Sequence, residues 1–210
     1  MTVDHGELLD QLDRSHARLE ASLAGLTDEQ ARQPSLLPGW SRGHVATHLS
    51  RNADALRRLL LGVLGGEQAE MYPGGQDARN AAISEGADRP AALLAADHDF
   101  AGSRLLSTLR LLPAELLDTA VRWRRPIAAR ELATLRWREV EIHHVDLGLE
   151  YAAADWPSGF VAATLATELP ALRAAHPEVE VPELPDHELL AWLLGRPTRA
   201  GLPVAPTWPF

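Results

Sequence analysis

The segment WREVEIHHVD, residues 137–146, carries three side chains whose types and spacing suit metal binding or proton transfer: Glu139, His143 and Asp146. A helix turns by about 100° per residue, so His143 lies about 40° and Asp146 about 20° from Glu139 around the helix axis. Three apolar residues flank this shared face: Leu135, Ile142 and Leu149. The face is therefore expected to point into a protein interior, where an unpaired charge is costly. The pattern predicts that Glu139 and His143 meet a partner from another element.

Two pairs of histidines each leave a choice of ligand. His144 lies about 100° from His143 around the helix, so only one of the two can share the face of Glu139, and we favour His143. In the earlier segment GHVATHL, His48 lies at the edge of the apolar arc, whereas His44 is rotated by about 40° toward solvent. His48 is therefore the better inward candidate, and His44 and His144 are second choices.

His48, Glu139 and His143 together would make the two-histidine, one-glutamate ligand set of several catalytic zinc sites, with a fourth position open for chemistry. The chain has no cysteine, so any metal must be held by His, Asp or Glu. The alternative is that Glu139 and His143 form a surface pair or a satisfied core histidine, as residues four apart on a helix commonly do.

Apolar residues recur at helical spacing over four long segments, which must position these side chains. The segments run from about Val3 to Leu26, from the N-cap Ser41 to Gly65-Gly66, from Pro90 to about Leu112, and from Ile127 to about Leu149. One short helix is expected between residues 72 and 90, and no convincing strand interrupts the series. The pattern predicts a mainly α fold with an antiparallel four-helix bundle.

A change to small residues after Tyr151 predicts a boundary between a bundle at 1–151 and a small C-terminal unit at 152–210. Helical runs are expected near Phe160–Ala175 and His187–Leu194. The segments EVEVPELP and GLPVAPTWPF are expected to supply short strands, which would make this unit a small α/β appendage.

Two other groups of residues are interpreted as structural. Asp97, His98 and Asp99 are assigned to a solvated helix face. Five tryptophans are assigned to packing: Trp123, Trp137, Trp156, Trp192 and Trp208.

Composition and charge exclude several classes of protein. With 29 acidic against 20 basic residues and a net charge of -9, the chain lacks the basic surplus expected of a nucleic-acid-binding protein. No apolar run approaches the roughly 20 residues of a membrane span, and the N-terminus does not resemble a secretion signal. We therefore expect a cytoplasmic protein with no membrane or nucleic-acid partner. The sequence leaves open whether it is a monomer or a homodimer.

Three segments resemble the mycothiol-dependent maleylpyruvate isomerase family: LPGWSRGHVATHLSRNADALRRLL, then MYPGG followed by ARNAAI, then WREVEIHHVDLGL. They cover the bundle, from about residue 1 to 150. The resemblance implies a DinB-like four-helix bundle that binds zinc through the second histidine of GHxxxH and the glutamate and histidine of REVxIH. In this chain those positions are His48, Glu139 and His143, the same three that the helical geometry favours.

The LLGR stretch near Arg196 is similar to the family's C-terminal domain, in which an arginine holds a substrate carboxylate. The resemblance therefore implies a catalytic role for Arg196. The alternative is that Arg196 interacts with the C-terminal end of the preceding helix. In that case the carboxylate binder would be sought among Arg79, Arg199 and the other arginines. The C-terminal unit is shorter than is usual for the family.

The implied activity is a cis–trans isomerisation of maleylpyruvate, or of a similar conjugated carboxylate, with zinc and mycothiol as cofactors. Zinc would lower the pKa of the mycothiol thiol, and the thiolate would add to the double bond, allow rotation and leave again. Arg196 would orient a carboxylate, and Asp146 would support a ligating imidazole or simply cap or pair. The alternatives are a mycothiol S-transferase that conjugates electrophiles, and a non-catalytic metal-binding bundle.

Overall fold

The computed structural model describes residues 4–123, 125–196 and 198–206, and the chain divides into two compact units, Met1–Leu149 and Glu150–Phe210. Both units are mainly helical, which confirms the predicted fold class. Among the described helices, none combines the length and the apolar character that a membrane span requires.

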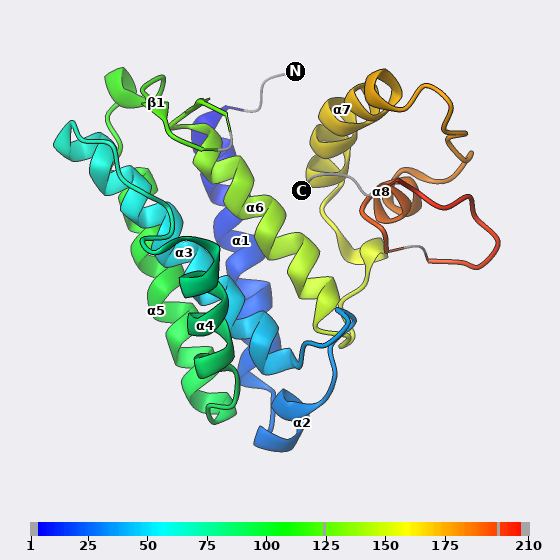
Figure 1. The fold of residues 1–210 in the computed structure, drawn as a ribbon, viewed down its shortest axis with the longest axis horizontal. Helices are drawn as coiled ribbons and strands as arrows, with labels where there is room; N and C mark the ends of the chain where they lie inside the picture. Colours follow the sequence, from blue (N-terminus) through cyan, green and yellow to red (C-terminus); the bar gives the residue numbers. More distant parts are fainter. Residues whose placement is uncertain (1–3, 124, 197, 207–210) are drawn as a thin grey trace. The chain divides into compact units, whose positions relative to one another are not determined.

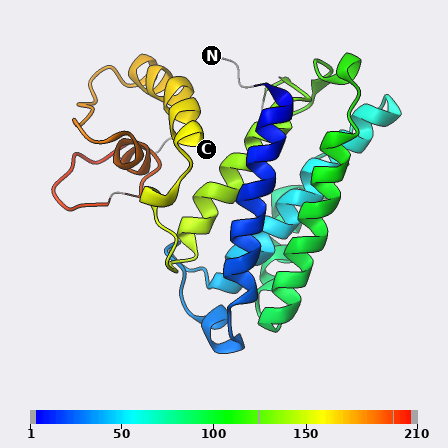
Figure 2. The ribbon, with the colours of Figure 1, turned by 180° about the vertical axis from the view of Figure 1, so that it is seen from behind.

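Four long helices form the first unit: α1 (His5–Ala24), α3 (Arg42–Gly65), α5 (Ala91–Arg110) and α6 (Glu131–Asp146). In Figure 1 they lie side by side, and Figure 2 shows α1 between α5 and α6 from behind. α3 packs against the same two neighbours. Each helix therefore turns one apolar face toward a shared core.

The directions of these helices differ from the predicted antiparallel arrangement. Arg51 of α3 bonds to Asp97 near the start of α5, and Arg57, further along α3, bonds to Thr108 near the end of α5. α3 and α5 therefore run parallel. The reason is the segment between them. The loop at 66–74 and α4 (Gly75–Ala87) together return the chain along α3, so that Ala87 lies beside Gly43 at the start of α3.

The two ends of α3 agree with the sequence-based expectation. Ser41 caps the first turn by accepting a hydrogen bond from the backbone N–H of His44, and the helix stops where Gly66 adopts a left-handed φ of 70°. The polar stretch after α1 holds a short helix that we did not predict, α2 (Asp28–Arg32). Thr27 and Gln30 cap it reciprocally, which is the signal that identifies it.

The fourth long helix begins later than predicted. Ile127–Ala128 forms a strand, β2, which pairs with β1 (Ala120–Val121) after the short 3-10 helix η1 (Ala114–Leu116). Both Val121 and Ile127 are buried by this pairing. Burial across the hairpin therefore holds these residues extended, and α6 starts only at Glu131.

The second unit contains η2 (Ala153–Asp155), α7 (Ser158–Ala175) and α8 (Asp186–Leu193). The strands expected in EVEVPELP and in the C-terminal tail do not occur among its described residues, 150–196 and 198–206. Pro182 and Pro185 remove backbone donors from the first of these segments, and Pro177 directly precedes it, so the segment offers few ladder bonds. Trp156 and Trp192 are buried as predicted, and Trp208 lies outside the described residues.

A buried arginine lies at the centre of the bundle. Arg136 on α6 has no exposed surface. Its Nε donates to His16 Nε2 at 3.1 Å, and its Nη1 donates to the Leu49 carbonyl at 2.8 Å and to Asn52 Oδ1 at 3.0 Å. Its Nη2 lies 3.5 Å from His98 Nε2. One guanidinium thus connects α6 with α1, α3 and α5.

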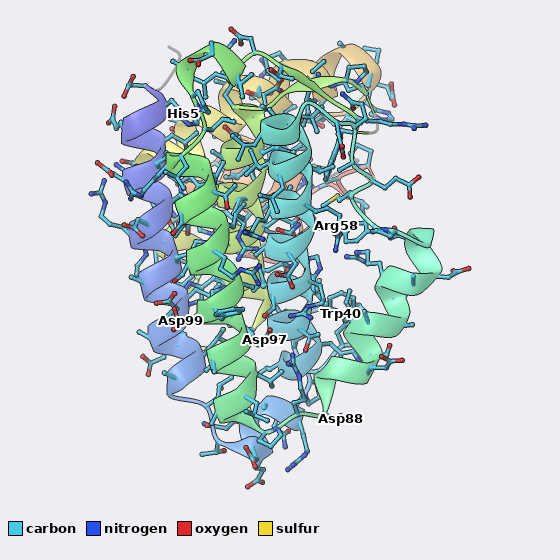
Figure 3. All side chains as sticks on the ribbon, turned by 90° about the vertical axis from the view of Figure 1, so that its left-hand side faces the viewer. His5, Trp40, Arg58, Asp88, Asp97 and Asp99 are labelled. Carbon is cyan, nitrogen blue, oxygen red and sulfur yellow. The ribbon has the colours of Figure 1, made fainter. Side chains whose placement is uncertain are left out.

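The assignment of His98 to a solvated helix face was wrong, because its ring is fully buried. It shares the inner face of α5 with Leu94 and Leu105. Asp97 and Asp99 are less buried than His98. In Figure 3, Asp97 lies on the α3 side of α5, where it pairs with Arg51, and Asp99 lies on the α1 side. Polar residues three in a row cannot all face solvent on a helix that is buried on two sides.

The buried histidines predict a pH dependence of folding. Burial, with the adjacent Arg136 charge, lowers the pKa of His98 to about 3 and lowers the pKa of His16 well below 6.5. Below about pH 6.5 the unfolded chain therefore binds more protons than the folded chain. The free energy of unfolding should fall as the pH drops from about 6.5 toward 3, by about 1.4 kcal/mol per pH unit for each such histidine.

Urea unfolding at pH 7.0, 6.0 and 5.0 measures this slope. In His98→Gln, the change of unfolding free energy with pH should lack the contribution of one buried histidine. His176→Gln is the control, because it changes a half-buried histidine of the second unit, and it should keep the wild-type slope. Equal slopes for wild type and His98→Gln would contradict the prediction.

Candidate metal centre

α3 and α6 bring the three predicted ligands together. His48 Nε2 lies 2.9 Å from Glu139 Oε2, and His143 Nε2 lies 3.5 Å from the same oxygen. The two imidazole rings meet edge to face with centroids 4.6 Å apart. One ligand atom from each residue lies within 4.8 Å of the other two, so a single cation between them can reach all three.

The group lies at the edge of the bundle core. The His48 side chain is 5% exposed, that of His143 is 17% exposed and that of Glu139 is 30% exposed. Solvent therefore reaches the Glu139 and His143 side of the group, whereas the His48 side is closed. This asymmetry suits a site that holds an ion on one side and admits a small molecule on the other.

The charges around Glu139 favour its ionised form. Burial alone raises the pKa of this carboxyl, but the hydrogen bond from His48 and the charges of His48, His143 and Arg136 outweigh burial and lower the pKa to about 2. Burial lowers the pKa of His48, against the effect of Glu139. At neutral pH the group is therefore an anionic carboxylate facing an imidazole that favours its neutral form, which are the states that ligate metals.

Asp146 supports the second imidazole. Its Oδ2 lies 2.8 Å from His143 Nδ1, and its side chain is fully buried. A carboxylate at this nitrogen holds the proton on Nδ1 and leaves the Nε2 lone pair directed at Glu139 and His48. The predicted support of a ligating imidazole by Asp146 thus has the contact that it requires.

Residues that the sequence analysis did not assign to the site surround His48. Trp40, which precedes α3, meets the His48 ring edge to face with centroids 5.6 Å apart, and Figure 3 shows it between α3 and α4. Arg79 of α4 donates from Nη2 to His48 Nδ1 at 3.0 Å, and its guanidinium lies over the Tyr72 ring. The segments that carry the family resemblance contain all three residues, and this is the signal by which they could have been found.

The two second-choice histidines have other partners. His44 Nδ1 lies 2.8 Å from Ser41 Oγ at the start of α3, where it completes the helix cap. His144 is buried, and its Nε2 lies 2.8 Å from Ser22 Oγ of α1. Neither ring belongs to the group around Glu139.

A second group of potential ligands, His16, Glu20 and His98, lies deeper in the bundle. Arg136 donates to Nε2 of His16 and lies beside Nε2 of His98, so each neutral ring carries its proton on Nδ1. Arg136 is fully buried and held in place by the Leu49 carbonyl and Asn52, so it stays beside both rings and repels a cation. This group therefore fits a metal ion less well than the group around Glu139.

The donors around Glu139 fit a divalent metal ion. Two imidazoles and one carboxylate make a nitrogen and oxygen set that zinc accepts, and three protein ligands leave a coordination position open. The second carboxylate, Asp146, adds the outer contact that such sites use.

Arg196 lies in the second unit, where its Nη1 donates to the carbonyl of Leu194 at 2.6 Å, just beyond the end of α8. This is the helix-end contact named above as the alternative. A role in binding a substrate carboxylate stays a prediction.

The chain is similar to known proteins in its sequence and in its fold. A family model described as the mycothiol maleylpyruvate isomerase N-terminal domain matches residues 12–148. The crystal structure of a mycothiol-dependent maleylpyruvate isomerase superposes with a TM-score of 0.86 at 24% sequence identity, covering 99% of this chain and 100% of that chain. The crystal structure of a histidine-to-alanine mutant of that enzyme gives the same values. A search of curated proteins found no match.

Single ligand substitutions test the metal centre. His48→Ala, Glu139→Ala and His143→Ala should each lose most of the zinc, because two remaining donors compete poorly with water. His144→Ala removes the adjacent imidazole without touching the group and should keep about one zinc per chain. Elemental analysis of the purified proteins, with circular dichroism to verify folding, measures the outcome. Full zinc content in all three ligand variants would rule the site out.

The contact between Asp146 and His143 predicts a graded effect on metal affinity. Asp146→Ala should weaken zinc binding by about 10–100-fold, because His143 loses the acceptor that fixes its ring and tautomer. Asp146→Asn keeps an acceptor oxygen and should lose less. Competition with a chelator measures both, with the exposed Asp99→Ala as the control. An unchanged zinc affinity in Asp146→Ala would show that the contact does not support the metal.

Proposed function

Because the chain belongs to the mycothiol-dependent maleylpyruvate isomerase family, we propose that it is an enzyme that isomerises maleylpyruvate, or a similar conjugated carboxylate, with the help of zinc and mycothiol. The observation that carries the proposal is the convergence of His48, Glu139 and His143, all of which lie within the matched residues. A solvent-accessible ligand set with an open position is what a reaction on a small molecule needs.

His48, Glu139 and His143 would hold the zinc ion, which would supply a Lewis acid able to lower the pKa of a thiol toward neutral pH. The chain contains no cysteine, so the thiol has to come from a small molecule. Mycothiol dependence of the family is consistent with that need.

The residues of the chain have separate tasks in this proposal. Glu139 offers an anionic ligand, because its pKa is held at about 2. Asp146 keeps the His143 ring oriented through Nδ1. His48 closes the inner side of the site, where Trp40 packs against its ring. Substrate and thiol are expected to approach from the accessible side of Glu139 and His143.

Isomerisation requires that the substrate's conjugated double bond become a single bond for a time that allows rotation about it. Negative charge then spreads onto the neighbouring carbonyl or carboxylate oxygens, and a nearby cation stabilises it. Arg196 is the candidate that the family resemblance suggests. We propose that Arg196 binds a substrate carboxylate.

The proposal is tested by incubating the zinc-loaded protein with mycothiol and either maleylpyruvate or a generic electrophile. We expect conversion of maleylpyruvate to its trans isomer with no net loss of thiol. His143→Ala should lower turnover by at least about 100-fold, because it removes a ligand of the ion that activates the thiol. His144→Ala is the matched control and should turn over normally.

Three outcomes separate the alternatives. Stoichiometric loss of thiol with formation of a conjugate would identify an S-transferase instead. No turnover of either substrate by the zinc-loaded protein would favour a non-catalytic bundle. In Arg196→Ala, a fall in kcat at unchanged zinc content supports the carboxylate contact, whereas unchanged kinetics would exclude it.

A further inference from the structure

Arg79 makes the polar contact to Nδ1 of His48, the ring nitrogen that does not face Glu139. Its Nη2 lies 3.0 Å from His48 Nδ1, its Nη1 donates to Asn80 Oδ1 at 3.0 Å, and its guanidinium carbon lies 5.6 Å from the centre of the Tyr72 ring. Among the described residues, no carboxylate lies within ion-pair distance of it. Arg79 is therefore a half-buried cation beside the proposed metal site whose partners are all neutral groups.

The direction of the contact with His48 fixes the tautomer of that ring. A guanidinium has donors and no acceptor, so His48 Nδ1 accepts the hydrogen bond from Arg79. The neutral ring then carries its proton on Nε2 and donates it to Glu139 Oε2, 2.9 Å away. The Nε2 atom that would ligate a metal is thus occupied by a proton.

A metal ion on His48 Nε2 is incompatible with this arrangement. Ligation uses the Nε2 lone pair and leaves the single imidazole proton on Nδ1, where it meets the N–H of Arg79. Two donors then face each other, and two cations lie at opposite edges of one ring. The other histidine differs, because His143 Nδ1 faces the carboxylate of Asp146, the partner that favours ligation through Nε2.

We propose that metal binding displaces Arg79 from His48, and that the released guanidinium binds a carboxylate of the substrate beside the ion. The inference rests on the proposed function, since it takes His48 as a metal ligand. Arg79 lies one hydrogen bond from the ring that would hold the ion, so a released guanidinium stays next to the site. A guanidinium fork binds a carboxylate through two parallel hydrogen bonds. Arg79 is thus a specificity residue for carboxylates, contributed by α4.

A titration with zinc alone, followed by the cis-dicarboxylate maleate, tests this. The wild type, Arg79→Gln, Arg79→Lys and Arg104→Gln are compared by calorimetry. Arg104 is the matched control, because its guanidinium carbon lies 5.0 Å from the Phe100 ring in a similar stacking contact but is not part of the site. Arg104→Gln should behave as wild type in both titrations.

The two titrations should move in opposite directions. Without maleate, Arg79→Gln should bind zinc about fivefold more tightly, the equivalent of one competing hydrogen bond removed. With zinc bound, maleate should bind at least about tenfold more weakly to Arg79→Gln than to wild type, because a charge-assisted fork is lost. Arg79→Lys should lie between the two for maleate, since it keeps the charge without the fork.

Each other outcome has a distinct meaning. If Arg79 only orients His48 for the metal, Arg79→Gln binds zinc more weakly, and the inference is overturned. Unchanged maleate affinity in Arg79→Gln also overturns it. If the wild type binds no zinc, the metal site itself is wrong and the proposed function fails with it, whereas normal zinc binding with unaltered maleate affinity removes only the role of Arg79.

Discussion

The arrangement of the bundle depends on one buried guanidinium. Arg136 on α6 is fully enclosed, and a buried cation is tolerated only when its donors are satisfied. The acceptors come from His16 on α1 and from Leu49 and Asn52 on α3, with His98 of α5 beside them. A shift of α6 along its neighbours would leave donors without acceptors. Since Glu139 follows Arg136 by one turn, the constraint that holds the helices in register also sets the height at which Glu139 meets His48.

The same guanidinium distinguishes the two groups of potential metal ligands in the bundle. It lies against the Nε2 atoms of His16 and His98 and is held there by the Leu49 carbonyl and Asn52, so it keeps an ion away from those rings. The pKa values of both rings are low because burial and the Arg136 charge disfavour protonation. The Arg136 charge also helps to lower the pKa of Glu139, but for a carboxyl a lower pKa favours the charged form. A single buried cation therefore makes one group a neutral structural core and favours an anionic ligand in the other.

Within the candidate centre the two imidazoles have unlike neighbours. His143 is supported by a buried carboxylate on its own helix, one turn away, so its orientation is part of α6 itself. His48 is contacted by Trp40 from the segment before α3 and by Arg79 from α4. One half of the centre is thus fixed by local helix geometry, and the other half depends on how two separate elements pack. The half that depends on packing is the one where the Arg79 guanidinium contacts the His48 ring. In our proposal, metal binding displaces Arg79 from that ring.

Much of this follows from the sequence, because the features concerned are local. A helical period places Glu139, His143 and Asp146 on one face whatever surrounds them. α3 begins after Ser41 and stops at Gly66 through contacts within a few residues. Features that join distant elements were decided by the tertiary structure. The sequence did not indicate that α4 returns the chain and makes α3 and α5 parallel, or that His98 is buried beside Arg136. Nor did it reveal that Arg79 rather than a carboxylate faces His48 Nδ1. Periodicity specifies which side of a helix is buried, but the partner that a buried polar atom meets depends on the register between helices, which only packing determines.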